Sequence, residues 1–230
     1  MAEINNYIYL SDAALSIKDI YSSPENFNKL YKEIDGSEQD SYLRHWLINN
    51  VPSAFKMHPI LLEQLIQYIS DHLSVSANDV KLIGSAKTGF SISPSPDYGK
   101  AFSEQSDLDF TVVNNSLFSE LDLEFNLWAE EYKNKKLMPY TDAQATFWPQ
   151  NLATCPSTLA RGFIDVNKIP SYNQFFKAKL INQCLYLVKD KLEKAHNFKV
   201  KKASIRVYKN WNAFKRQLKI NTESVLKTLE

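Results

Sequence analysis

Residues 108–113 form the clearest strand pattern of the chain, because they run Leu-Asp-Phe-Thr-Val-Val with a bias towards β-branched and aromatic side chains. Side chains two positions apart on a strand point to the same face, so we expect Asp107 and Asp109 to project together from one end of a sheet. Two carboxylates that close repel each other unless one takes up a proton or a cation neutralises them. Hard oxygen ligands of this kind select magnesium or manganese. The pattern therefore predicts a divalent-cation site.

A glycine-serine turn precedes this strand in the sequence. Residues 79–83 are short and apolar with a β-branched bias, and they run directly into Gly84 and Ser85. Glycine permits a tight turn and a close approach of the backbone, while a serine at a helix start offers a hydroxyl and an amide to an anion. We therefore expect a phosphate chain to lie between this turn and the two aspartates.

The turn and the paired aspartates together resemble the signature of the DNA polymerase β-like nucleotidyltransferase superfamily. That signature is a strand-terminal Gly-Ser followed by a strand with two alternate aspartates, and it is matched position by position at Gly84, Ser85, Asp107 and Asp109. The resemblance covers roughly residues 79–166. The superfamily includes polymerases, tRNA- and antibiotic-modifying enzymes, cyclic-oligonucleotide synthases and toxin-antitoxin modules, so the resemblance indicates a reaction type more closely than a substrate.

The spacing within the motif is unusual for that superfamily. The 21 residues 86–106 between the serine and the first aspartate exceed what compact members show. Residues 91–104 are rich in Ser, Pro and Gly, a composition that favours a long exposed loop and accounts for the excess. The sequence segments 84–91 and 205–211 are similar to those of an uncharacterised bacterial branch. This similarity does not imply a particular activity.

The resemblance implies in-line transfer of a nucleoside monophosphate from an NTP, such as ATP, or a dNTP to a hydroxyl acceptor. Two Mg²⁺ or Mn²⁺ ions would be bridged by Asp107 and Asp109, and a third carboxylate on a later strand would complete the metal site. Asp165, within the strand-like run 163–166, is our candidate for that third ligand and for accepting the acceptor's proton. Asp142 is the alternative, although no strand pattern surrounds it.

Several side chains are candidates for binding the phosphates. Ser85, Lys87 and Thr88 would position the β- and γ-phosphates through hydrogen bonds and charge. A solvent-facing position on a helical turn is the alternative for Lys87. Arg206 and Lys209 are candidates for contacts with the triphosphate or a nucleic-acid backbone, and an exposed basic helix face is the alternative for both.

The net charge of +1 conceals opposite charges in two parts of the chain. Residues 1–167 have 12 Lys and Arg against 22 Asp and Glu, whereas residues 168–230 have 15 against 4. This division indicates that the C-terminal part faces phosphate, or that it packs against the acidic part of its own chain or a second copy. A solvated, lysine-rich helical surface is the alternative.

The fold class that we predict is α+β, a nucleotidyltransferase-type small mixed β-sheet with flanking helices and a helical C-terminal part. We divide the chain into an N-terminal helical segment, 1–58, a nucleotidyltransferase core, 59–170, and a basic helical part, 171–230, packed on the core. Apolar periodicity predicts helices over residues 60–73, 119–136, 172–196 and 204–218. In the last of these, a core-facing stripe is expected from Val207, Trp211, Phe214 and Leu218.

The remaining sequence features bear on location and partners. No run of about 18 apolar residues and no signal-peptide pattern occurs, so we expect a cytoplasmic protein without membrane contact. Cys155 and Cys184 lie far apart, which favours two buried thiols. The resemblance suggests transfer that involves an oligonucleotide, a cyclic nucleotide, RNA, DNA or a protein. It also suggests a setting in antiphage defence or in a toxin-antitoxin module, with a partner protein from a neighbouring gene. The alternative is a catalytically inactive nucleotide- or nucleic-acid-binding subunit.

Overall fold

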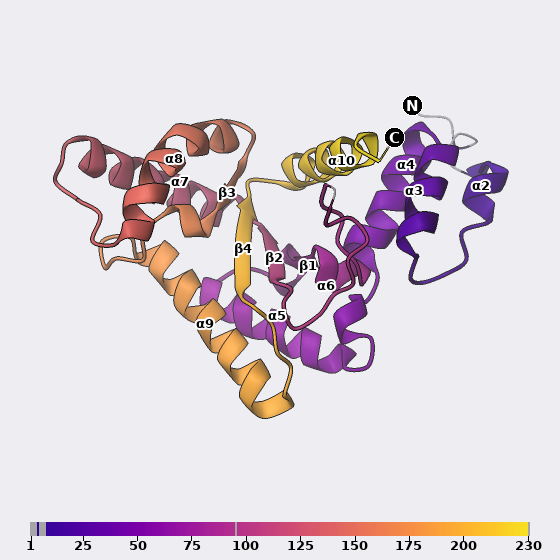
Figure 1. Cartoon of the computed structure of the whole chain (residues 1–230), viewed down its shortest axis with the longest axis horizontal. Helices are drawn as coiled ribbons and strands as arrows, with labels where there is room; N and C mark the ends of the chain where they lie inside the picture. Colours follow the sequence, from indigo (N-terminus) through magenta and orange to yellow (C-terminus); the bar gives the residue numbers. More distant parts are fainter. Residues whose placement is uncertain (1–3, 5–7, 95, 230) are drawn as a thin grey trace.

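A four-stranded mixed sheet lies at the centre of the computed structural model, which describes residues 4, 8–94 and 96–229 (Figure 1). Its strand order is β1-β2-β4-β3, with bounds β1 Val80–Ile83, β2 Leu108–Val113, β3 Phe163–Asp165 and β4 Ala203–Tyr208. The two inner strands, β2 and β4, are parallel, and each outer strand is antiparallel to its neighbour. The predicted α+β class with a small mixed sheet is therefore confirmed.

Helices flank this sheet. Their bounds are α2 Asp12–Leu15, α3 Pro24–Glu33, α4 Gly36–Arg44, the π-helical turn η1 His45–Asn49, α5 Pro59–Leu73, α6 Ser85–Thr88, α7 Asn115–Lys133, α8 Asp142–Ala160, α9 Phe176–His196 and α10 Trp211–Lys227. The helices predicted over residues 60–73, 119–136 and 172–196 correspond to α5, α7 and α9. In Figure 1, α7 and α8 gather at one end of the molecule and α2, α3 and α4 at the other.

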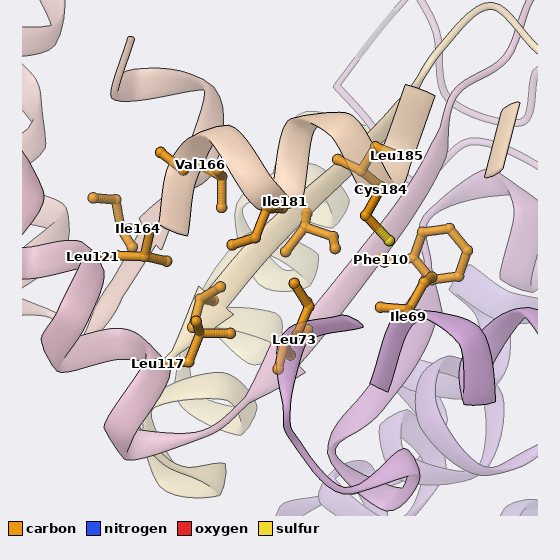
Figure 2. Packing of buried hydrophobic residues seen from close by; sticks show 14 of the residues in the cluster. Ile69, Leu73, Phe110, Leu117, Leu121, Ile164, Val166, Ile181, Cys184 and Leu185 are labelled. Carbon is orange, nitrogen blue, oxygen red and sulfur yellow. The ribbon is translucent and has the colours of Figure 1, made fainter. Parts of the chain in front are cut away.

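The main hydrophobic core lies between one face of the sheet and helices α5 and α9. Phe110 of β2, Ile69 of α5 and Ile181 of α9 are each at most 1% exposed, and Figure 2 shows these side chains gathered between the elements that carry them. The apolar residues on α5 and α9 recur every three or four positions, so each helix buries one stripe against the sheet. This packing fills one face of the sheet, so the residues of the opposite face are the ones left for a site.

The opposite face of the sheet carries the polar residues. Cα partners on neighbouring strands share a face, and the register pairs Asp109 with Ser204 and Thr111 with Arg206. The far end of this face is closed by a small cluster in which η1 and α10 cover Val113. Asp109 and Ser204 lie at the other end of this face, which that cluster does not cover.

The helix predicted from Ser204 is wrong in its first half. Residues 203–208 form β4, and α10 begins only at Trp211. Val207 is a fully buried strand residue, and Trp211 is 38% exposed, so the helical stripe expected across both does not exist. Ser-Ile-Arg-Val alternates polar and apolar residues with the period of a strand, and pairing with β2 and β3 settles the ambiguity.

The C-terminal part of the chain contributes to the core of the sheet. Because β4 lies between β2 and β3, residues 171–230 provide a central strand and do not merely pack on a core confined to residues 59–170.

Helix α8 was not predicted, because Pro149 and Pro156 lie inside it and prolines disfavour helix interiors. Asp142, the alternative third carboxylate, begins α8.

Ion pairs connect the basic C-terminal part with the acidic remainder of the chain. Four such pairs occur among the described residues: Lys177–Glu120, Lys202–Asp107, Arg206–Asp165 and Lys219–Asp40. Packing against the acidic part of the same chain, one of the interpretations of the charge division, is therefore observed. Two of these four pairs involve predicted site aspartates.

The two cysteines are free thiols buried in the core, as predicted. Burial raises the pKa of each thiol to about 11, so both stay protonated at neutral pH.

Within the described part of the chain, no helix has the length and apolar character needed to cross a membrane.

Candidate functional site

The paired aspartates lie at the start of β2, beside the end of β1. Asp107 directly precedes the strand, and Asp109 lies in register with Ile83 of β1 and Ser204 of β4. Ser204 Oγ donates a hydrogen bond to Asp109 Oδ1 at 2.6 Å. Burial raises the pKa of Asp109 and the negative charge of Asp107 raises it further, while the hydrogen bond from Ser204 opposes the rise. Lys202 also opposes it, because its positive charge acts on Asp109.

Asp107 is only partly neutralised by its surroundings. Its Oδ2 lies 3.4 Å from Lys202 Nζ, and its side chain is 28% exposed, so the carboxylate has access to solvent. Its Oδ1 is buried and has no hydrogen-bond partner among the residues that the structure describes. A buried carboxylate oxygen without a donor is costly, and a bound cation would remove that cost.

The glycine-serine turn lies directly against Asp109. Gly84 adopts a φ of +68°, and a Cβ at this position would lie 3.0 Å from Asp109 Oδ2. Both the left-handed backbone and the close approach require glycine. Ser85 then begins α6, which is only four residues long, so the helix dipole that would favour an anion there is small.

Lys87 is a buried side chain of α6 and not the solvent-facing residue of the alternative interpretation. It is 2% exposed, and its Nζ has no hydrogen-bond partner within the described ranges. Burial, together with the positive charge of Lys81, lowers the pKa of Lys87 to about 8. An unpaired ammonium inside a protein costs stability.

We expect Lys87→Met to stabilise the fold by roughly 2 kcal/mol at pH 7. The folded-state pKa of about 8 lies below the ordinary lysine value of 10.5, so protonated Lys87 costs free energy at neutral pH, and this cost is lost as the pH rises from 8 to 10.5. The gain should therefore shrink across that range. Urea unfolding at pH 7 and pH 10 measures it, with Lys191→Met on the exposed surface of α9 as the control. An equal gain in unfolding free energy at pH 7 and pH 10 would contradict the lowered pKa of Lys87.

The structure does not bring Asp165 together with the other two aspartates. Arg206 donates to Asp165 through Nε to Oδ1 at 2.6 Å and through Nη2 to Oδ2 at 3.1 Å. Asp165 lies on β3, which β4 separates from β2, and it is in register with Arg206, two residues beyond the partner of Asp109. No group of three His, Cys, Asp or Glu side chains able to hold a metal occurs among the described residues.

The remaining predicted phosphate ligands lie in varied settings. The Thr88 hydroxyl is within hydrogen-bond distance of the Phe90 and Gly84 carbonyl oxygens, so it supports the start of the loop. The Arg206 guanidinium is paired with the Asp165 carboxylate, and its positive charge also acts on Asp109. Lys209 is exposed in the turn after β4, where its backbone N–H donates to a carbonyl oxygen of the β3 region.

Two residues of this site were missed by the sequence analysis. Ser204 and Lys202 lie beside Asp109 and Asp107 only because β4 runs parallel to β2. The alternation of residues 203–208 was the signal that could have found them, and it was interpreted as part of a helix.

Two cavities lie elsewhere on the molecule. One of about 770 Å³ is lined by α4 and α10, with Arg44 and Lys215 among its walls, and one of about 350 Å³ lies beside Phe147 of α8. Neither is lined by the Gly84 turn or by the paired aspartates. At the candidate site itself, the Asp107 side chain is 28% exposed.

Comparison of the chain with protein-family models, with curated proteins and with solved structures finds no match. Asp107 and Asp109 fit one divalent cation, because they offer two hard oxygen donors and an unpartnered buried oxygen. The resemblance implies a second metal ion with Asp165 among its ligands. In this structure Asp165 is paired with Arg206.

Proposed function

We propose that this chain is a metal-dependent nucleotidyltransferase that transfers a nucleoside monophosphate from an NTP or dNTP to a hydroxyl acceptor. The observation that supports this most is the close approach of the Gly84 turn to Asp109, where a Cβ on Gly84 would lie 3.0 Å from Asp109 Oδ2. The turn and the aspartates are 23 to 25 residues apart in the sequence, yet antiparallel pairing of β1 and β2 brings them to the same strand ends.

Each residue of the site has a distinct part in this proposal. A divalent ion held by Asp107 and Asp109 would stabilise negative charge on the reacting phosphate oxygens. Ser204 orients the Asp109 carboxylate through its hydrogen bond. Gly84 lets a phosphate chain approach the backbone, and the Ser85 hydroxyl can donate to a phosphate oxygen.

A second candidate function is favoured by the pairing of Asp165 with Arg206. A guanidinium that binds both carboxylate oxygens neutralises Asp165 and blocks it as a metal ligand. A chain with only two available carboxylates would bind a nucleotide or nucleic acid without reacting, as a subunit of a larger assembly. The suggested antiphage or toxin-antitoxin context rests on the resemblance alone.

The test is incubation with each radiolabelled NTP and dNTP, with Mg²⁺ or Mn²⁺, in the presence and absence of RNA and DNA. We expect metal-dependent release of pyrophosphate or transfer of label, lost in Asp107→Asn and retained in Asp142→Asn, a matched change on the exposed start of α8. Nucleotide binding without product under every condition would favour the inactive subunit. Neither binding nor product would contradict both functions.

A further inference from the structure

Lys202 is fixed beside Asp107 by the parallel pairing of β2 and β4. Its Nζ lies 3.4 Å from Asp107 Oδ2. The backbone on both sides is hydrogen-bonded across the two strands, because the Lys201 N–H donates to the Ser106 carbonyl and the Leu108 N–H donates to the Lys202 carbonyl, each at 2.9 Å. The backbone of Lys202 is therefore held at the strand ends that carry the aspartates.

One ammonium is too little charge for this pair of carboxylates. Lys202 contacts Asp107, but its positive charge also acts on Asp109. The Oδ1 atom of Asp107 keeps no partner among the described residues, so the site retains negative charge and an unsatisfied acceptor. A divalent cation supplies twice the charge and accepts oxygen ligands from both residues, so it neutralises the pair better than Lys202 does.

The contact between Lys202 and Asp107 is of a kind that a cation can displace. The Lys202 side chain is 56% exposed, and exposed ion pairs contribute little to stability. Lysine carries its charge on a flexible stem with three rotatable donors, so it can change partners while its backbone stays in place. An ammonium that leaves Asp107 would be free to contact phosphate oxygens bound to the same cation.

We propose that Lys202 neutralises Asp107 in the absence of metal and, when a divalent cation arrives with a nucleotide, transfers its contact from Asp107 to the triphosphate. This inference rests on the proposed function and adds to it a phosphate-binding residue that the resemblance does not supply. Lys202 thus weakens the binding of free metal ion to Asp107 but strengthens the binding of the metal-nucleotide complex.

The test measures two affinities in Lys202→Met, using Mn²⁺ alone and Mn²⁺ with non-hydrolysable α,β-methylene analogues of the four NTPs. Loss of the competing ammonium should make free Mn²⁺ bind about two- to five-fold more tightly. Loss of a charged donor to phosphate should make the best-bound analogue bind about ten-fold more weakly. Calorimetry or Mn²⁺ electron paramagnetic resonance gives both values without turnover. Lys201→Met is the matched control, and Lys202→Arg should keep both affinities close to those of the unaltered chain.

The opposite signs of the two changes separate this role from a structural one. A variant that weakens both affinities through local distortion, or that changes neither, overturns the role of Lys202 while leaving the nucleotidyltransferase proposal intact. If the unaltered chain binds neither Mn²⁺ nor any analogue, the proposed function fails and the inference fails with it. Tighter Mn²⁺ binding together with weaker analogue binding supports the exchange of partners.

Discussion

Asp109→Asn is expected to lower nucleotidyl transfer by about 10³-fold while raising the melting temperature of the chain by roughly 2 °C. The loss follows because the amide gives up the charge that would hold the metal. The gain follows because burial raises the pKa of Asp109, which means that the ionised carboxylate is costly in the folded state at neutral pH. Asparagine keeps an acceptor for Ser204, so the hydrogen bond at Oδ1 survives.

The pH dependence of the stability gain gives a check that does not depend on activity. A raised folded-state pKa imposes its cost above that pKa, and the cost disappears below the ordinary aspartate value of 3.8. The advantage of Asp109→Asn should therefore shrink as the pH falls. Differential scanning calorimetry from pH 7 to pH 4 measures it, with Asp142→Asn as control. A folded variant with undiminished transfer would refute the catalytic role.

Trp128→Ala is expected to destabilise the chain by about 3–5 kcal/mol, a large part of the stability of an ordinary domain. Trp128 of α7 is fully buried and lies in an aromatic cluster. Its ring stacks on Tyr132 with centroids 5.8 Å apart, and it meets the edge of Trp148 at 5.6 Å. Truncation would remove these contacts and leave a cavity between α7 and α8.

Trp211→Ala provides the matched control for this change. Trp211 is 38% exposed at the start of α10, and we expect its truncation to cost less than about 1.5 kcal/mol. Urea unfolding of both variants, followed by circular dichroism, compares the two residues directly. An equal cost for the two tryptophans would contradict the arrangement of α10 and return Trp211 to the core, where the sequence alone had placed it.

The elements that could be predicted are those whose signal is local. Strand β2 and helix α5 follow from short apolar patterns with a clear period, and the Gly84 turn follows from residue types. Strand β4 could not be recognised in this way, because residues 203–208 fit a helical stripe that continues into Phe214. Its identity depends on pairing with two strands far away in the sequence, which local propensity does not report.

The same long-range pairing explains why the site was predicted only in part. The strand order puts Ser204 beside Asp109 and Arg206 beside Asp165, and neither contact is visible until β4 is placed in the sheet. Lys87 shows a second limit, because its residue type leaves both a phosphate ligand and a solvent-facing position open, whereas the packing of a one-turn helix against β1 buries it. Burial of an individual side chain depends on such packing.

The most direct measurement is an anomalous difference map from crystals of the chain grown with MnCl₂ and a non-hydrolysable NTP. We expect a manganese peak within about 2.5 Å of one oxygen each from Asp107 and Asp109, next to the Gly84 turn. A map with no peak at this pair, or with manganese bound only elsewhere, would contradict it.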